Sequence, residues 1–450
     1  MRQVNVRKTA PPPPVPIEPV SRKRTPIRWG DEWTQLRTLL RRAFTSKMRN
    51  RGNLVLTLLV PPVLAAIIGW ALYFTDEGTY DFASAFHIPT YIFISLLVAM
   101  FLALMNSVDD IIRDRVILHR ERNLDVRLPY YIFAKFSTLA MFSAVQCALF
   151  VVVGNSILEV RGMFWPYFIF MFITATSGTS LGLVISSIVG DSKTAANFVP
   201  LVLIPQLIFG GALIKYEEMN RDLDVMYTFN RWFSTHPEMA AEREDSKLRI
   251  PLISRFVATH YSYEALVVAQ AKLNPLSKRQ DDIQEQIDLL IAKKNRTPEE
   301  AGRLEDLKDT LALLSGMESG SLQEVERRLR RVDRILEGRV LDRGELRSKT
   351  SGVTAERLYT NQKITDLVAK AETEQSDYRR QVPVNVFFSP MKHYLLFRIP
   401  EISPLGIRSR AVEIHTSVYL FNAMVLVGSS FVLMCALYSI LKRQLRPKGL

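Results

Sequence analysis

NSVDDIIRDRVILHRERNLDVRLPYYIFAK, residues 106–135, separates two long apolar runs of the chain. The segment is crowded with charge, and its cations outnumber its acids. A short basic segment between two membrane spans belongs on the cytoplasmic side. Apolar residues between Asp110 and Asn123 recur at roughly helical spacing. We therefore expect a short cytoplasmic helix that joins two spans, where a soluble partner can push on a membrane domain.

The composition places this segment in a membrane protein. Hydrophobic residues make up 48% of the 450-residue chain, and they gather in runs that are nearly free of charge. Lys and Arg exceed Asp and Glu by 58 to 45, a net charge of +13, and the densest basic runs flank the apolar ones. This excess indicates membrane topology and argues against a nucleic-acid partner. Cys147 and Cys435 both lie in apolar runs, which favours packing over a disulfide or a metal site.

Six runs are long enough to cross a membrane as helices. They cover residues 54–74, 88–108, 130–153, 163–189, 195–214 and 417–441. The N-terminal tail, the loop after the second span and the C-terminal tail are rich in cations, and an even number of spans places all three in the cytoplasm. The pattern predicts an all-α polytopic protein with both termini cytoplasmic. An outer region without a disulfide fits a bacterial inner membrane.

The apolar runs also divide the chain into segments. In order, we expect a flexible proline-rich basic tail (1–29), an amphipathic interfacial helix (30–51), transmembrane helices one to five (52–214) with a cytoplasmic coupling loop (109–129), an extracytoplasmic re-entrant segment (215–271), an extracytoplasmic helical hairpin insertion (272–382), a return segment (383–415), and the sixth transmembrane helix with a basic cytoplasmic tail (416–450). Within the re-entrant segment, residues 250–270 are too polar to span and predict a re-entrant or interfacial helix.

The insertion carries the patterns of helices with defined starts. Thr297 and Glu300 form a capping box, and Ser321 with Glu324 forms another. Apolar stripes at helical spacing accompany both, which predicts a helical hairpin or a short coiled coil standing off the membrane. Two interpretations stay open, a solvated bundle without a partner and a platform for an extracytoplasmic protein. The return segment, VPVNVFFSP at its start, suggests a short strand or an extended chain.

Several enzyme motifs are absent from the sequence. It contains no G-x-x-x-x-G-K-[ST] phosphate loop, no H-E-x-x-H zinc motif and no G-x-S-x-G elbow. The six histidines are scattered, so each is expected to be structural or solvated. We therefore expect no catalytic residues, no metal site and no ATP binding by this chain in the phosphate-loop mode.

Four stretches occur in the order typical of one family. They are DRVILHRERN (114–123), YIFAK (131–135), SLGLVISSIVGDSKTAANFVPLVLIPQLIFGGALI (180–214) and HYSYEAL (260–266). Together they resemble the ABCG-type exporter permeases of ABC transporters. The resemblance covers both ends and the membrane part but not the insertion. Two features depart from the family: a proline-rich tail stands where many members carry the ATPase, and Leu124-Asp125-Val126 replaces a usual aromatic.

The resemblance implies a mechanism with named residues. Two permease chains, most simply a homodimer, would each dock on a separate ATPase subunit, which binds ATP and Mg while this chain binds no cofactor. The residues that would couple to the ATPase are Asp114, Arg115, Arg120, Glu121, Arg122, Tyr131 and Lys135. The substrate path would be lined by Phe93, Leu97, Met100 and Phe101, below a gate formed by Pro205, Phe209, Gly210 and Gly211. A slot this apolar suits a hydrophobic or lipid-like substrate.

Two other functions compete with an exporter. In the first, the chain is a mechanotransmission subunit that relays ATPase motion through the extracytoplasmic hairpin to a periplasmic partner. In the second, it is a receptor or scaffold without an ATPase. Deleting the hairpin separates an exporter from a relay, and a co-purifying ATPase separates both from a scaffold.

Overall fold

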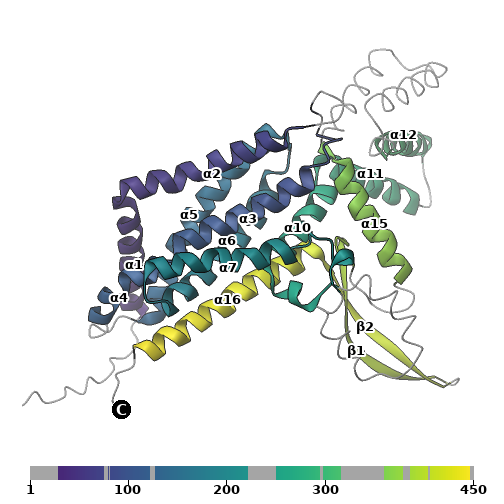
Figure 1. Cartoon of the computed structure of the whole chain (residues 1–450). Helices are drawn as coiled ribbons and strands as arrows, with labels where there is room; N and C mark the ends of the chain where they lie inside the picture. The colour runs from purple at the N-terminus through teal and green to yellow at the C-terminus, as the bar shows by residue number, and fades with distance from the viewer. Residues whose placement is uncertain are drawn as a thin grey trace, which may run out of the picture.

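A computed structural model describes residues 29–74, 80, 82–121, 127–220, 250–293, 297–315, 359–378, 386–403 and 406–445. The proline-rich tail, the Ser321–Glu324 capping box and Arg122 lie outside these residues. The described part is mostly helical, as predicted, and its longest helices lie side by side as a bundle (Figure 1).

Among the residues that the structure describes, six helices are long and apolar enough to cross a membrane, in agreement with the predicted number of spans. They are α2 (Arg51–Leu72), α3 (Ile88–Ser107), α5 (Leu128–Ile157), α6 (Phe164–Ile188), α7 (Ser192–Phe209) and α16 (Val418–Gln444). A helix satisfies its own backbone hydrogen bonds, which any segment crossing lipid requires. Prolines lie inside α2 and α7, where each removes one of those bonds.

The two ends of the bundle carry different elements. At one end, α1 (Trp29–Arg49) runs across the spans, and α4 (Asp110–Glu121) lies beside the C-terminal end of α16 (Figure 1). We call this the α4 end. At the other, the α10 end, lie α10 (Ala258–Lys272) and the short 3-10 helices Tyr216–Glu218 and Leu252–Phe256. The chain thus begins and ends its membrane part at the same end, as an even number of spans requires.

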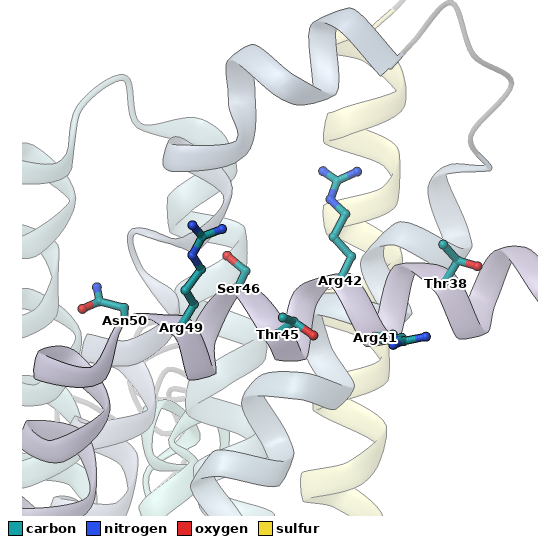
Figure 2. A pocket seen from close by; sticks show the side chains of 7 residues that line it. All are labelled: Thr38, Arg41, Arg42, Thr45, Ser46, Arg49 and Asn50. Carbon is teal, nitrogen blue, oxygen red and sulfur yellow. The ribbon is translucent and has the colours of Figure 1, made fainter.

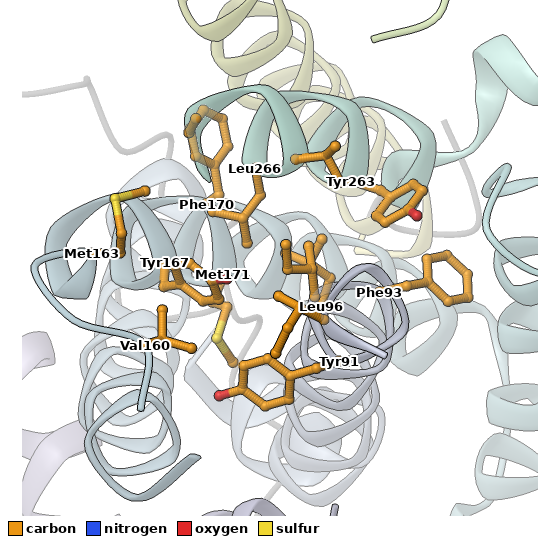
Figure 3. Packing of buried hydrophobic residues seen from close by; sticks show 14 of the residues in the cluster. Tyr91, Phe93, Leu96, Val160, Met163, Tyr167, Phe170, Met171, Tyr263 and Leu266 are labelled. Atoms are coloured by element: carbon orange, nitrogen blue, oxygen red, sulfur yellow. The ribbon is translucent and has the colours of Figure 1, made fainter. Parts of the chain in front are cut away.

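Small residues let α6 approach α3 closely. A Cβ at Gly178 would lie 3.0 Å from the carbonyl oxygen of Met100, and one at Gly182 would lie 2.0 Å from the Ser107 hydroxyl. Small residues at such positions allow two helix backbones to approach closely. Around this contact, Tyr91 and Tyr167 are fully buried, and Leu266 of α10 covers them from above (Figure 3). The core of the bundle is therefore continuous with α10.

The burial of α10 bears on the prediction of a re-entrant or interfacial helix for residues 250–270. Every residue from Thr259 to Ala271 is buried except Tyr261, which is half-buried. A helix lying flat on a bilayer keeps one face among headgroups. The structure instead favours a helix inserted between α3, α6, α7 and α16.

Three described helices belong to the predicted insertion. α11 (Pro275–Ala292) and α12 (Pro298–Ser315) pack against each other through Leu276, Ile283, Ile287 and Leu304. The predicted capping box is present, because the Thr297 N–H donates to Glu300 Oε2 at 3.0 Å and the Glu300 N–H donates to Thr297 Oγ1 at 3.3 Å.

The third insertion helix, α15 (Gln362–Tyr378), returns to the bundle. Just before it, Tyr359 packs against the α11–α12 cluster, and Asn361 donates to the carbonyls of Phe82 and Ala85 at 2.7 and 2.8 Å. The insertion therefore leaves and rejoins the membrane part at neighbouring places.

One element corrects the all-helical expectation. Strands β1 (Met391–Ser403) and β2 (Gly406–Ser417) form an antiparallel ribbon with a bulge between Leu395 and Phe397. The predicted return segment 383–415 is thus largely a β-hairpin. Pro400 argues against a strand in a sequence, but both strands of a two-stranded ribbon are edge strands, where proline is tolerated.

Candidate functional site

The candidate site lies at the α4 end and begins with the start of α4. Its first backbone N–H groups have no partner within the helix. Those of Ile111 and Ile112 donate instead to the Ser186 hydroxyl of α6, at 3.0 and 3.2 Å. Ile111 and Leu118 are buried against α5, α6 and α16. The N-terminal end of α4 is therefore fixed to α6 by hydrogen bonds as well as by packing.

A cluster of opposite charges joins α4 to two other helices. Lys135 Nζ of α5 lies 3.0 Å from Asp110 Oδ2 and 2.7 Å from Asp114 Oδ2. Lys47 Nζ of α1 lies 2.8 Å from Asp110 Oδ1, and the Tyr131 hydroxyl donates to Asp114 at 3.3 Å. Asp110 is 8% exposed and Lys135 is 14% exposed. Charges this buried need partners, so the cluster holds α1, α4 and α5 in one arrangement.

A second set of contacts joins α4, and the residue just before it, to the C-terminal end of α6 and the N-terminal end of α7. The Arg115 guanidinium donates to the carbonyls of Ser187 and Val189 at 3.2 and 2.8 Å, where the last carbonyls of α6 lack helical partners. Asp109 accepts a hydrogen bond from the Ser192 hydroxyl at the start of α7. Displacing α4 would thus displace α1, α5, α6 and α7 together.

The structure brings four of the predicted coupling residues together. Asp114, Tyr131 and Lys135 share one cluster, and Arg115 lies on the adjoining side of α4. Arg120 and Glu121 belong to α4, but their side chains, like the whole of Arg122, lie outside the described part.

Sequence reasoning missed Lys47 and Asp110 as members of the cluster. The available signal was an acid in the first turn of one helix and a cation in the last turn of another. Such a signal does not say that the two residues meet.

The basic face of α1 borders an open cavity beside this cluster. The cavity has a volume of about 660 Å³ and is lined by Thr38, Arg41, Arg42, Thr45, Ser46, Arg49 and Asn50. Arg42 and Arg49 extend from the same side of α1, with Ser46 between them (Figure 2). Guanidinium groups bind carboxylates and phosphates in bidentate geometry. This face suits an acidic partner.

The predicted substrate-path residues divide into two pairs. Phe93 and Met100 are buried, at 3% and 1% exposure, whereas Leu97 and Phe101 are half-buried. The Phe93 ring packs edge-on against Tyr263 of α10. Only Leu97 and Phe101 therefore offer surface to a ligand or to a second chain in this arrangement.

The predicted gate residues lie where α7 meets the α10 end. A Cβ at Gly210 would lie 2.5 Å from Phe93, and Gly211 has a φ of 83°, which favours glycine. The Tyr216 hydroxyl donates to the Phe209 carbonyl at 3.0 Å and lies 2.6 Å from His260 Nδ1. Pro205 is exposed on α7.

Gln206, one residue after Pro205, reinforces the same contact. Its side-chain oxygen accepts the Thr259 N–H at 3.1 Å, and its carbonyl accepts the Thr259 hydroxyl at 2.8 Å. The end of α7 is thus held against the start of α10 by side chains that no sequence motif identified. Within the described residues, no group of three or more His, Cys, Asp or Glu side chains gathers as a metal site would require.

Comparisons with known proteins bear on this arrangement. Residues 34–232 match the family model described as ABC-2 type transporter. The chain is also similar to the ABC transporter ATP-binding/permease protein Rv1747 of Mycobacterium tuberculosis, with 24% identity over 221 residues. That match covers 45% of this chain and 24% of the relative, so the chain matches about a quarter of the relative's length.

The matched region contains α2, α3, α5, α6 and α7, together with α4 and its charge cluster. The family match and the six apolar helices of the described residues agree on a multi-pass membrane protein. Over residues 34–232, the chain is similar to the membrane domain of ABC-2 type transporters.

Proposed function

We propose that the chain is the permease subunit of an ABCG-type exporter that moves a hydrophobic or lipid-like substrate out of the cytoplasm or the inner leaflet. A second copy of the chain completes the permease, and a separate ATPase subunit with ATP and Mg supplies the energy. The α4 end faces the cytoplasm, and both termini lie there. The insertion and the ribbon then lie on the extracytoplasmic side.

The observation that carries this proposal is the attachment of α4. One short helix is bound to α1 and α5 by the Asp110–Asp114–Lys135 cluster, and to α6 and α7 by Ser186, Arg115 and Asp109. A partner that pushes on α4 therefore moves four neighbouring helices at once. Conversion of nucleotide-driven closure into a movement of membrane helices needs such an element.

The surface near α4 supports an acidic or mixed-charge partner. Arg113 is 68% exposed, and the three arginines of the α1 cavity lie at the same end. Glu121, with Arg120 and Arg122 beside it in the sequence, would add charge-assisted contacts to the ATPase.

The exposed face of α7 supports a substrate path between two copies. Leu201 and Ile204 of α7 are 62% and 53% exposed, and Leu97 and Phe101 of α3 are half-buried. In a paired permease, these side chains would line an apolar slot, which a lipid-like molecule fits. Phe93 lies behind them, against Gly210, where it would support the gate.

A pull-down from mild detergent tests the ATPase partner. Tagged wild type is compared with Glu121→Arg and with the control Glu299→Arg, which reverses an exposed charge on the distant helix α12. We expect ATPase activity to co-purify with wild type and with the control, and to be lost with Glu121→Arg. If no ATPase accompanies any form, the exporter proposal is wrong and a scaffold is favoured.

The mechanotransmission alternative has its own supporting observation. Asn361 binds the α2–α3 loop through the carbonyls of Phe82 and Ala85, so the insertion is attached directly to spans one and two. Movement of α3 would reach the insertion through this contact. Replacing residues 278–358 by a short glycine-serine linker separates the two functions. Export into the outer leaflet survives the deletion in a permease and is lost in a relay.

A further inference from the structure

The segment that enters the ribbon makes a buried ion pair with α10. We call residues 386–392 the ribbon foot. Lys392 Nζ, at the start of β1, contacts Glu264 Oε1 of α10, and the two side chains are 4% and 1% exposed. The Phe388 N–H donates to the same carboxylate oxygen at 3.1 Å. The carboxylate therefore fixes two points of the ribbon foot.

The other oxygen of Glu264 binds the last span. Asn422 Nδ2 of α16 donates to Glu264 Oε2 at 2.9 Å and to the Tyr261 carbonyl, also at 2.9 Å. Asn422 is fully buried. One carboxylate thus joins α10, α16 and β1, three elements that are distant in the sequence.

A buried ion pair of this kind is poor support for stability. Apolar side chains of similar volume often stabilise a fold equally well or better, because desolvation of the charges offsets their attraction. What the pair does provide is one defined arrangement of the groups it joins. The structure therefore favours a positioning role for Glu264 and Lys392.

The ribbon foot also touches the group that holds the end of α7. Phe387 stacks on the His260 ring with 5.1 Å between centroids, and it meets the Tyr216 ring edge-on at 4.8 Å. His260 lies four residues before Glu264, one helical turn away on the same side of α10. Tyr216 in turn donates to the Phe209 carbonyl.

The backbone of the foot is held in an unusual shape. Phe388 has a φ of 68°, a conformation that a bulky side chain adopts only where its surroundings impose it. Its N–H binds Glu264, and its ring packs against Tyr263 and Phe387. Removing the charge of Lys392 would weaken one of the contacts that keep this shape.

We propose that Glu264 and Lys392 are positioning residues for transport: their ion pair seats the ribbon foot on α10, and the seated foot keeps the C-terminal end of α7 closed through His260 and Tyr216. This inference rests on the proposed function, because the end of α7 acts as a gate only if the chain is a permease. The contact that it describes can be tested without a substrate.

The test measures the accessibility of a cysteine next to the gate. Ala212, half-buried beside Gly211, is replaced by Cys in the full chain, with Cys435→Ser to remove the exposed native thiol. The native Cys147, 3% exposed inside the bundle, stays as an internal reporter of general loosening. N-ethylmaleimide labelling of both thiols is followed by peptide mass spectrometry on the purified protein in lipid nanodiscs.

Three substitutions are compared in this background. Lys392→Met leaves Glu264 without its cation. We expect the thiol of Ala212→Cys to be labelled about tenfold faster, while Cys147 stays protected. A tenfold change corresponds to about 1.4 kcal/mol in the free energy of opening the end of α7. Lys392→Arg keeps the charge and should restore slow labelling. Lys272→Met removes an exposed ion pair between α10 and Glu372, and it should leave the labelling rate of both cysteines unchanged.

Two results would overturn the inference. One is unchanged labelling of Ala212→Cys in Lys392→Met. The other is equal acceleration at Ala212→Cys and Cys147, which would mean that the pair only stabilises the fold. If the labelling follows the expectation but no ATPase co-purifies in the pull-down, the positioning role stands and the exporter function fails.

Discussion

At the α4 end, two carboxylates share two ammonium groups, and their side chains are between 8% and 26% exposed. At the α10 end, one carboxylate binds one ammonium group, and neither is more than 4% exposed. In the first cluster, Asp110 has two cations and Lys135 has two anions, so each of these two charges keeps a partner when one contact is lost while the helices move together. Glu264 and Lys392 have no second ion partner in the described structure. The first arrangement suits a part that moves, and the second suits a part that keeps its position.

The largest effect on stability is expected from breaking the ion pair between Glu264 and Lys392. Glu264→Gln leaves Lys392 as an uncompensated buried charge, which costs about 3–5 kcal/mol of stability. The double substitution Glu264→Leu with Lys392→Met removes both charges and should recover most of that loss. Thermal unfolding in detergent checks both. A double variant as unstable as Glu264→Gln would contradict the view that the pair positions more than it stabilises.

A smaller effect on stability is expected from removing one cation of the Asp110–Asp114–Lys135 cluster. Lys135→Met removes hydrogen bonds to two carboxylates, each worth at most about 1.5–3 kcal/mol, but the contacts that remain offset part of this loss. Lys47 still binds Asp110, and Asp114, at 21% exposure, can turn toward water. Arg113→Met at the same end is the control, since the exposed pair with Asp109 contributes at most about 1 kcal/mol. If Lys135→Met lowers the thermal stability as much as Glu264→Gln does, the proposed difference between the two ends, shared against single ion partners, is wrong.

The last effect concerns acid and the α10 end alone. Burial lowers the pKa of His260 from 6.5 to about 4, so the folded protein favours the neutral ring. Glu264, Lys392 and Arg255 are the charged groups that act on the ring, with the Tyr216 hydroxyl as its direct partner. The stability from the neutral ring is complete above pH 6.5 and is lost as the pH falls toward 4.

The cysteine reporter checks this pH dependence. Labelling of Ala212→Cys, corrected for thiol reactivity with a model thiol, should accelerate between pH 6.5 and 4, and His260→Asn should flatten the profile. A profile that is flat in the chain with His260 intact would exclude the ring as the sensitive group.

The α4 end and the α10 end also differ in how many of their contacts could be predicted from the sequence. The family resemblance of DRVILHRERN and YIFAK named Asp114 and Lys135 as coupling residues, and the structure places the two side chains in one ion cluster. Lys47 was missed because its partner Asp110 lies on another helix. Glu264 and Lys392 are 128 residues apart, and no periodicity or spacing joins residues across such a distance. The ribbon was not predicted beyond a short strand or an extended chain at the start of the return segment, and the structure shows two paired strands, Met391–Ser403 and Gly406–Ser417.

The spans themselves followed from composition because lipid leaves few alternatives to an apolar helix. The close approach of α3 and α6 depends on small residues such as Gly182, which the sequence shows without saying which helix lies opposite. Buried polar contacts such as Gln206 with Thr259 obey no such simple rule, and they decide how α7 ends.

The attachment of the insertion has a consequence for the history of the chain. Tyr359 packs beside Leu276, and the Gln270 side chain reaches the Tyr359 carbonyl at 3.5 Å, so the part of the insertion between Leu276 and Tyr359 begins and ends at neighbouring places. A segment with adjacent junctions can be gained, exchanged or lost in a single genetic event without re-routing the rest of the fold.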